Sequence, residues 1–262
     1  MFAFEKKNQG SSTIMGKKLG EPLMKIVCIT PVWNEIEYIG YKHNWCKNNG
    51  IDHYVINNES TDGTREWLVK NKVKFHDLDT GGSFHLGIIH KEILKTAKKI
   101  KPDWLIFLGC DLFAQTSDTL RNEITKARGN TIYFPTYIVF NSGETPGNPF
   151  HTYYYVKQYI NLPLIVKWHP KITLSGDAFT HPYPKVVTGN GILINYGMTK
   201  PKKEREETLA RRKKAWEKGL RWNYGKHYIK AQKKDWIWSK DKLTDIRNIH
   251  PELITNLQKQ VC

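Results

Sequence analysis

The chain has 262 residues and an ordinary globular composition, with 39% hydrophobic and 12% aromatic residues, so it can bury a sizeable core. It contains no run of about 18 apolar residues, and we therefore expect no membrane-spanning helix. The net charge of +16 attracts polyanions, anionic membrane surfaces or phosphorylated ligands, and basicity alone makes nucleic acid a partner to consider.

The N-terminus and the cysteines bear on cellular location. Residues 1–22 are polar and small and lack the continuous apolar core of a signal peptide, so we expect a mobile leader. The four cysteines form no C-x-x-C pair, which disfavours zinc and a disulfide framework. Cys28 and Cys110 lie in apolar runs, where cysteine is mostly a small buried hydrophobe. Reduced thiols favour a cytoplasmic protein.

Strand and helix patterns alternate from residue 24 to residue 109. Short apolar runs predict buried strands, and helical spacing or capping residues predict the helices between them. The predicted strands are 24–30, 51–56, 73–78 and 103–109. The predicted helices are 36–47, one capped by Asp62 and running through Val69, and one with the apolar stripe Leu86, Ile89, Ile93 and Ala97. This alternation implies right-handed crossovers and a parallel sheet.

A polar loop follows each of these four strands. In open parallel sheets, ligands bind beyond the carboxyl ends of the strands. The loops 30–35, 57–60, 79–82 and 109–111 should therefore surround one crevice. The loop 57–60 carries more hydrogen-bonding side chains than a turn requires, so we expect it to line a ligand site.

The pattern changes after about residue 130. The run 131–140 is typical of a strand bent at Pro135, and 141–149 is a long loop rich in glycine and proline. Strand fragments follow within 167–186, and 191–197 is a last short strand. We expect these segments to form a second, mixed half of the domain.

The C-terminal segment is strongly basic. Residues 200–262 begin as a charged helix and contain 18 Lys and Arg against 8 Asp and Glu, a surplus of ten positive charges. We therefore divide the chain into a leader (1–22), one α/β domain (23–199) and a basic helical extension (200–262). The extension is either a solvated helical surface or a peripheral contact with an anionic membrane.

Several motifs together resemble one enzyme family. "ITPVWNE", "YVINNESTDGT", the Gly81-Gly82 turn before a helix, and "DWLIFLGCDLF" follow the order and spacing of family 2 glycosyltransferases with the GT-A fold, over roughly residues 24–115. The segment "NYGMTKPKKEREETLARRKKAW" is similar to the "HYG…RP" ending of one bacterial and viral branch. The resemblance implies an α/β GT-A fold, with a Rossmann-like nucleotide-binding half, a mixed acceptor-side half and a C-terminal helical tail.

The resemblance also implies a nucleotide-sugar donor, expected to be a UDP-sugar. The positions that carry over to the donor site are Thr30, Pro31, Asn34, Glu35, Asn58, Ser60, Gly81 and Gly82. The family usually has Asp where Asn58 stands. An amide offers both a donor and an acceptor to a base, so the base preference stays open.

The family's D-x-D motif holds a divalent metal that bridges the donor diphosphate. Here the motif reads Gly109-Cys110-Asp111, and only Asp111 keeps a carboxylate. Because Mn²⁺ and Mg²⁺ prefer oxygen ligands, we expect Asp111 to hold one of them together with the diphosphate and water. The branch's tail histidine is replaced by Asn195.

These features predict a glycosyltransferase whose acceptor is a glycan, glycolipid or glycoprotein hydroxyl. An inverting transfer needs a carboxylate base, for which Asp177 is the candidate and Glu144 the reserve. Two alternatives stay open. One is a basic nucleic-acid-binding protein, which the absence of a recognised binding signature disfavours. The other is a degenerate GT-A domain that binds nucleotide without turnover, favoured by Gly109 and Asn195.

Overall fold

The computed structural model describes residues 24–140, 154–158, 163–175, 178–198, 200, 202–217, 244–245 and 251–261. The predicted leader, the loop 141–149 and both candidate bases, Asp177 and Glu144, lie outside these residues. Of the helices within the described ranges, none combines the length and the apolar sequence that crossing a membrane requires.

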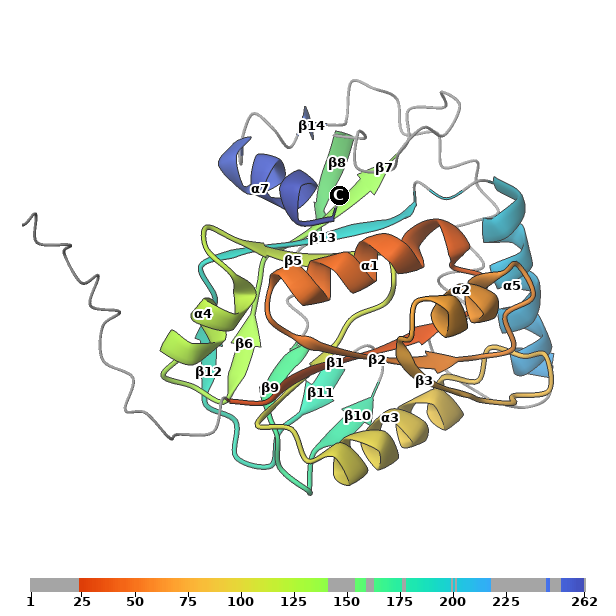
Figure 1. Ribbon diagram of the computed structural model, residues 1–262, viewed down its shortest axis with the longest axis horizontal. Helices are drawn as coiled ribbons and strands as arrows, with labels where there is room; N and C mark the ends of the chain where they lie inside the picture. The colour runs from red at the N-terminus through yellow and green to blue at the C-terminus, as the bar shows by residue number, and fades with distance from the viewer. Residues whose placement is uncertain are drawn as a thin grey trace, which may run out of the picture.

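A mostly parallel sheet of seven strands forms the centre of the described part of the chain (Figure 1). The strands lie in the order β12 (Val186–Thr188), β6 (Thr131–Tyr133), β9 (Ile165–Lys167), β4 (Trp104–Phe107), β1 (Ile26–Val32), β2 (Asp52–Asn57) and β3 (Lys74–Asp77). Strand β9 is antiparallel to both of its neighbours, and the other pairs are parallel. This order and direction confirm the predicted Rossmann-like half.

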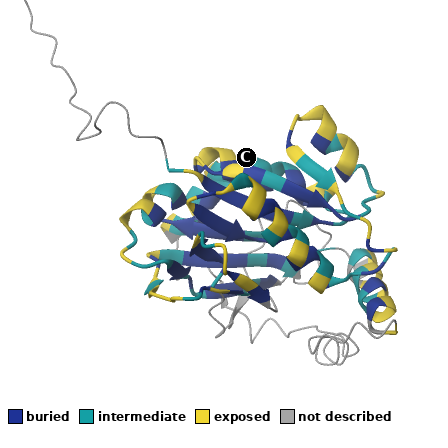
Figure 2. Ribbon diagram, turned by 90° about the horizontal axis from the view of Figure 1, so that it is seen from below, coloured by how far each residue is buried: buried dark blue, intermediate teal, exposed yellow. Residues whose placement is uncertain are grey.

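Helices connect the first four strands and cover the sheet. They are α1 (Ile36–Asn48), α2 (Thr64–Lys70) and α3 (Leu86–Ile100). The predicted apolar stripe of α3 is confirmed, because all four of its residues are buried. Strands β1, β2 and β4 are largely buried, whereas the edge strand β3 is partly exposed and the helices expose their outer faces (Figure 2). Cys28 and Cys110 are buried free thiols, as predicted.

A second, mixed sheet completes the α/β architecture, and with it the predicted GT-A fold class is confirmed. Within the described residues its order is β14 (Thr244–Asp245), β8 (Tyr154–Gln158), β7 (Thr136–Phe140), β13 (Gly191–Met198) and β5 (Leu112–Thr116). Strands β13 and β7 are parallel, and the other pairs are antiparallel. Helix α4 (Leu120–Lys126) follows β5, and β10 (Thr173–Ser175) pairs with β11 (Ala178–Thr180) as a separate hairpin.

The prediction of one bent strand over 131–140 is wrong. Strand β6 ends at Tyr133 in the large sheet, and β7 begins at Thr136 in the second sheet. Pro135, between them, has no N–H to donate to a ladder, although its carbonyl accepts from Leu193 N at 2.8 Å. The proline therefore marks the point at which the chain changes sheets.

Strand β1 also continues past its predicted end, through Pro31 to Val32. Strand β4 pairs with β1 only as far as Ile29, so beyond that point β1 has a partner on one side, where Pro31 lies opposite Ile56. Proline has no N–H to donate, so it is tolerated where a strand has no neighbour on that side.

The register brings the ends of the strands level. Val32 lies opposite Asn57 on β2, which in turn lies opposite Asp77 on β3. The loops that follow these strands therefore lie at one edge of the sheet. We call the loops 33–35, 58–63, 78–85 and 108–111 the carboxyl edge. Helix α5 (Lys202–Glu217) stands beyond the ends of β2 and β3 (Figure 1).

The last helix, α7 (Pro251–Val261), lies in the segment predicted as a basic helical extension, but its packing on the domain was not predicted. It packs on α1 through the buried side chains of Ile254, Leu257 and Val261. The end of α1 is also hydrogen-bonded to it, because Asn48 Nδ2 donates to the backbone carbonyl of Gln260 at 2.7 Å.

Asn49, the C-cap residue that follows α1, provides a test of this packing. Its Oδ1 accepts from Leu120 N at 2.7 Å, and its Nδ2 donates to Trp45 O at 2.9 Å and to Gln260 Oε1 at 3.0 Å. Because Leu120 N would lose its acceptor in a buried place, Asn49→Ala should lower the free energy of unfolding by about 1–3 kcal/mol in urea denaturation. The exposed Asn48→Ala should lower it by less than about 1 kcal/mol. Equal losses would contradict this role.

Candidate functional site

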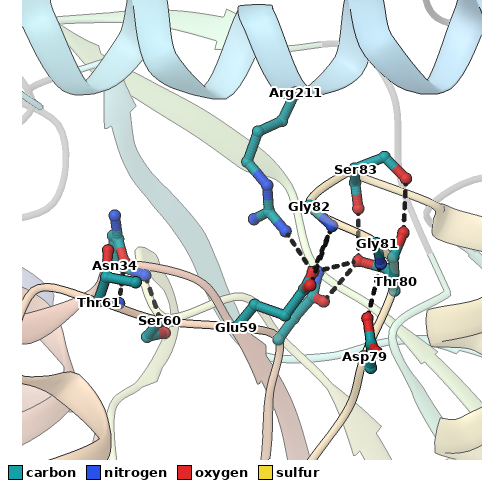
Figure 3. Close-up of polar contacts among 11 residues, drawn as sticks. Asn34, Glu59, Ser60, Thr61, Asp79, Thr80, Gly81, Gly82, Ser83 and Arg211 are labelled. Atoms are coloured by element: carbon teal, nitrogen blue, oxygen red, sulfur yellow. Dashed lines mark hydrogen bonds and ion pairs between the residues drawn. The ribbon is translucent and has the colours of Figure 1, made fainter.

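The loops after β1 and β2 hold each other at the carboxyl edge. Asn34 and Glu59 both have positive φ, at 52° and 57°, which is uncommon for residues other than glycine. Asn34 N donates to Ser60 Oγ at 3.0 Å, and Thr61 N donates to Asn34 Oδ1 at 2.8 Å (Figure 3). These paired loops fix the backbone of two predicted donor-site residues, Asn34 and Ser60.

Asp62 joins the first turns of two helices. The N-cap position of α2 is Gly63, whose φ is 98°, one residue after the predicted Asp62, but the Asp62 side chain still accepts from the first N–H of the helix. The Asp62 carboxylate accepts from Thr64 N and from Ile36 N, each at 3.0 Å. Carboxylates are favourable at helix N-termini, where N–H groups lack partners within the helix. The carboxylate thus sets α1 and α2 relative to each other.

Glu59 connects three segments at the carboxyl edge (Figure 3). Its carboxylate accepts from Gly82 N at 2.9 Å and lies 2.8 Å from Thr80 Oγ1 and 3.3 Å from Arg211 Nη2. Partial burial raises the pKa of Glu59, but the donors from Gly82 and Thr80 outweigh it and lower this pKa below its ordinary value. The glycine turn predicted to contact the donor therefore holds Glu59 through Gly82.

Arg211 reaches the carboxyl edge from α5 (Figure 3). Its side chain is buried, and the guanidinium carbon lies 4.1 Å from the centre of the Trp33 ring. Burial lowers the pKa of Arg211, and Glu59 offsets part of that effect. Guanidinium groups nevertheless stay charged in proteins. Arg211 Nη1 is buried and has no hydrogen-bond partner within the described part of the chain.

Asn58, at the end of β2, has a buried amide that is only partly satisfied. The side chain is 2% exposed, its Oδ1 lies 2.8 Å from Thr80 Oγ1, and its Nδ2 has no partner among the residues described. The Thr80 hydroxyl has one proton and also lies 2.6 Å from Ser83 O. If the amide is turned by 180°, Nδ2 donates to this hydroxyl and Oδ1 is the unpaired atom. Either way, one polar atom is left for a ligand.

A second charged cluster lies beside these loops. Lys200, which follows β13, forms an ion pair with Glu35 Oε1, and its Nζ lies 3.6 Å from Asp111 Oδ2. The Lys200 and Glu35 side chains are each 13% exposed. Glu35 Oε2 is buried and has no partner within the described ranges. We call Glu35, Lys200 and Asp111 the charged triad.

The triad contains two carboxylates and one ammonium. This excess of negative charge stabilises the protonated forms of its members. Burial raises the pKa of Glu35 to about 7, although Lys200 lowers it. Burial also lowers the pKa of Lys200, but the Glu35 and Asp111 carboxylates outweigh it and raise this pKa above its ordinary value. Lys200 is therefore a permanent cation in the triad.

A backbone hydrogen bond holds Asp111, and two glycines leave room for its carboxylate. Tyr196 N donates to Asp111 O at 2.8 Å, and Gly197 N donates to Asn195 Oδ1 at 2.8 Å. A Cβ added at Gly197 would lie 2.7 Å from Asp111 Oδ2, and one added at Gly109 would lie 2.9 Å from Asp111 Oδ1. Both positions therefore need glycine for the Asp111 carboxylate to lie where it does.

The remaining predicted residues are distributed as follows. Thr30 is fully buried, with its Oγ1 3.1 Å from His53 Nε2, and Pro31 lies within β1. Gly81 and Gly82 both have positive φ, in the loop after β3. Among the residues described, no group of three or more His, Cys, Asp or Glu side chains is placed to hold a metal ion.

Sequence reasoning missed Lys200 and Arg211 as site residues, and it included Glu59 and Trp33 only as members of the predicted crevice loops, without their contacts. Lys200 had a visible signal, because it belongs to the tail motif, but nothing near it in the sequence indicated its partners. Arg211 is one of many cations in a basic helix, and its partner Glu59 lies 152 positions earlier in the chain.

Comparisons with known proteins give weak similarities. No family model matches the chain, and no curated protein matches it. TarS 1–349 of S. aureus, solved in complex with UDP, matches over 55% of this chain and 47% of its own, with 19% identity and a TM-score of 0.38. HddC from Yersinia pseudotuberculosis matches over 72% of this chain and 99% of its own, with 11% identity and a TM-score of 0.38.

The chain thus spans about half the length of the TarS structure that it matches. CMP:2-keto-3-deoxy-manno-octonic acid synthetase in complex with CTP matches over 76% of this chain and 87% of its own, with 10% identity and a TM-score of 0.30. Because these scores are low, the fold rests on the strand order and register of this chain itself.

The lowered pKa of Glu59 predicts a pH dependence of stability. A carboxyl whose pKa is lower in the folded chain contributes stability above its unfolded pKa and loses it as the pH falls through the folded value. The unfolding free energy should therefore decrease from pH 6 to pH 3 by more in the wild type than in Glu59→Gln, as measured by urea denaturation. Glu66→Gln, at an exposed position on α2, is the control. If both variants lose as much stability as the wild type, Glu59 does not contribute.

Proposed function

We propose that this protein is a glycosyltransferase that binds a nucleotide-sugar donor at the carboxyl edge and moves the sugar to an acceptor hydroxyl. The observation that carries the proposal is the pair of buried, unpaired polar groups there, the Asn58 amide and Arg211 Nη1. A buried polar group without a hydrogen-bond partner raises the free energy of the protein. Binding of a ligand that supplies partners to both groups is therefore favoured. Neutral amides suit bases, and guanidinium groups suit phosphates.

A uracil base fits the Asn58 amide in either orientation. Uracil has an imide N–H that can donate to Oδ1 and carbonyl oxygens that can accept from Nδ2. This chemistry supports a UDP-sugar as the donor. The cations Arg211 and Lys200 contact Glu59 and Glu35, in two loops of the carboxyl edge, and they supply positive charge for a diphosphate.

The proposed transfer is a single displacement. The bond between the anomeric carbon and the diphosphate oxygen breaks, and its electron pair stays on the diphosphate. The acceptor oxygen forms the new bond to the anomeric carbon from the opposite side, and its proton passes to a carboxylate base. Asp177 remains the predicted base, with Glu144 as the reserve.

The test is a thermal-shift panel of nucleotide sugars, followed by an assay of released nucleoside diphosphate. A ligand that binds only the folded state raises the melting temperature by mass action. We expect a shift with UDP-sugars and turnover when an acceptor is present. Binding without turnover for any donor and acceptor would instead favour the nucleotide-binding alternative. The absence of any shift would contradict the proposal.

A variant of Asn58 can test the proposed contact between its amide and the base of the donor. Asn58→Ala removes the amide that would meet the base, so it should weaken UDP binding in calorimetry by about 1 kcal/mol, or about fivefold. Asn71→Ala, which removes an exposed amide at the end of α2, should leave the affinity unchanged. Wild-type affinity in Asn58→Ala would remove this residue from the site.

A further inference from the structure

The divalent metal implied by the family does not fit the residues at Asp111. The described residues offer no cluster of three acidic, histidine or cysteine side chains there, so a Mn²⁺ or Mg²⁺ ion would depend on the diphosphate and water for most of its oxygen ligands. The second carboxylate of the D-x-D motif is absent at Gly109, where a Cβ would already lie 2.9 Å from Asp111 Oδ1. The tail histidine is also replaced, and Asn195 Oδ1 accepts from Gly197 N.

A cation already lies at this position. Lys200 Nζ is paired with Glu35 and lies 3.6 Å from Asp111 Oδ2, so a metal bound to Asp111 would be next to a buried ammonium. Like charges at such a distance repel strongly where water is largely excluded. A metal ion on Asp111 Oδ2 would displace Lys200 from that oxygen, and the mostly buried ammonium would lose one of its two carboxylate partners.

We propose that the Lys200 ammonium takes the place of the metal and contacts the diphosphate of the donor directly. This inference rests on the proposed function. An ammonium has three donors, and the pair with Glu35 uses one of them. Asp111 Oδ2 is beyond hydrogen-bond distance, so the ammonium can donate to a phosphate oxygen while it stays paired with Glu35.

In this scheme each member of the triad has a separate task. Lys200 stabilises the negative charge that grows on the diphosphate oxygen as the bond to the sugar breaks. Glu35 holds the ammonium in place, and its own backbone is held because Glu35 N donates to Thr64 Oγ1 at 2.9 Å. Lys200 would therefore be a catalytic residue, and Glu35 a positioning residue.

The first test uses the wild-type protein and needs no substitution. UDP affinity is measured by calorimetry in EDTA and again in 1 mM Mn²⁺, a concentration of about the order that weak metal sites require. We expect the two affinities to agree within about threefold. Binding of UDP only in the presence of Mn²⁺ would overturn the inference while the proposed function stands. Failure of UDP and of all other nucleoside diphosphates to bind in either condition would overturn both.

The second test separates the diphosphate from the nucleoside. A hydrogen bond to a charged group is worth roughly 10- to 100-fold in affinity, so Lys200→Met should weaken UDP binding by about that factor in EDTA. The affinity for uridine, which has no phosphate, should be unchanged. Lys126→Met, an exposed lysine on α4, removes the same charge away from the triad and is the matched control.

Lys200→Arg keeps the positive charge and covers the case in which Lys200→Met does not fold. We expect this variant to bind UDP within about tenfold of the wild type, because a guanidinium also donates to phosphate but has a different shape. An equal loss of UDP and uridine affinity in a folded Lys200 variant would show that the residue only supports the fold, and would overturn the inference.

Discussion

One largely buried ion pair, between Glu35 and Lys200, connects the two halves of the described structure. Glu35 lies in the loop after β1 of the large sheet, Asp111 lies in the loop between β4 of the large sheet and β5 of the second sheet, and Lys200 follows β13, the longest described strand of the second sheet. The pair thus joins the two halves at the edge where the parallel strands end. Removing Lys200 would leave two carboxylates without their cation, whereas removing Glu35 would leave the ammonium with Asp111 as its remaining partner.

A second contact of the same kind lies nearby. Arg211, on α5, reaches Glu59, and Glu59 in turn holds the turn after β3 through Gly82 N. In both contacts a cation from the C-terminal segment meets a carboxylate from the first half of the chain. Part of the basic surplus is therefore used inside the molecule, in contacts with these two carboxylates.

The sequence predicted the features that depend on local pattern. The apolar runs located β1 to β4, the buried stripe located α3, and the polar residues after each strand located the carboxyl edge, because parallel strands end on one side. The contacts of Lys200 and Arg211 depend instead on partners 165 and 152 positions away, which no local pattern contains. The exchange of sheets at Pro135 was missed for a related reason, since a bend and a change of sheet have the same local sequence.

The central claim is that an ammonium, and not a metal ion, meets the donor diphosphate. The most direct measurement is a crystal structure of the protein with UDP and Mn²⁺, with anomalous scattering recorded at the manganese edge. The account predicts a phosphate oxygen within hydrogen-bond distance of Lys200 Nζ and no anomalous peak at Asp111. A manganese peak bound to Asp111 and the diphosphate, with Lys200 displaced from Glu35, would contradict it.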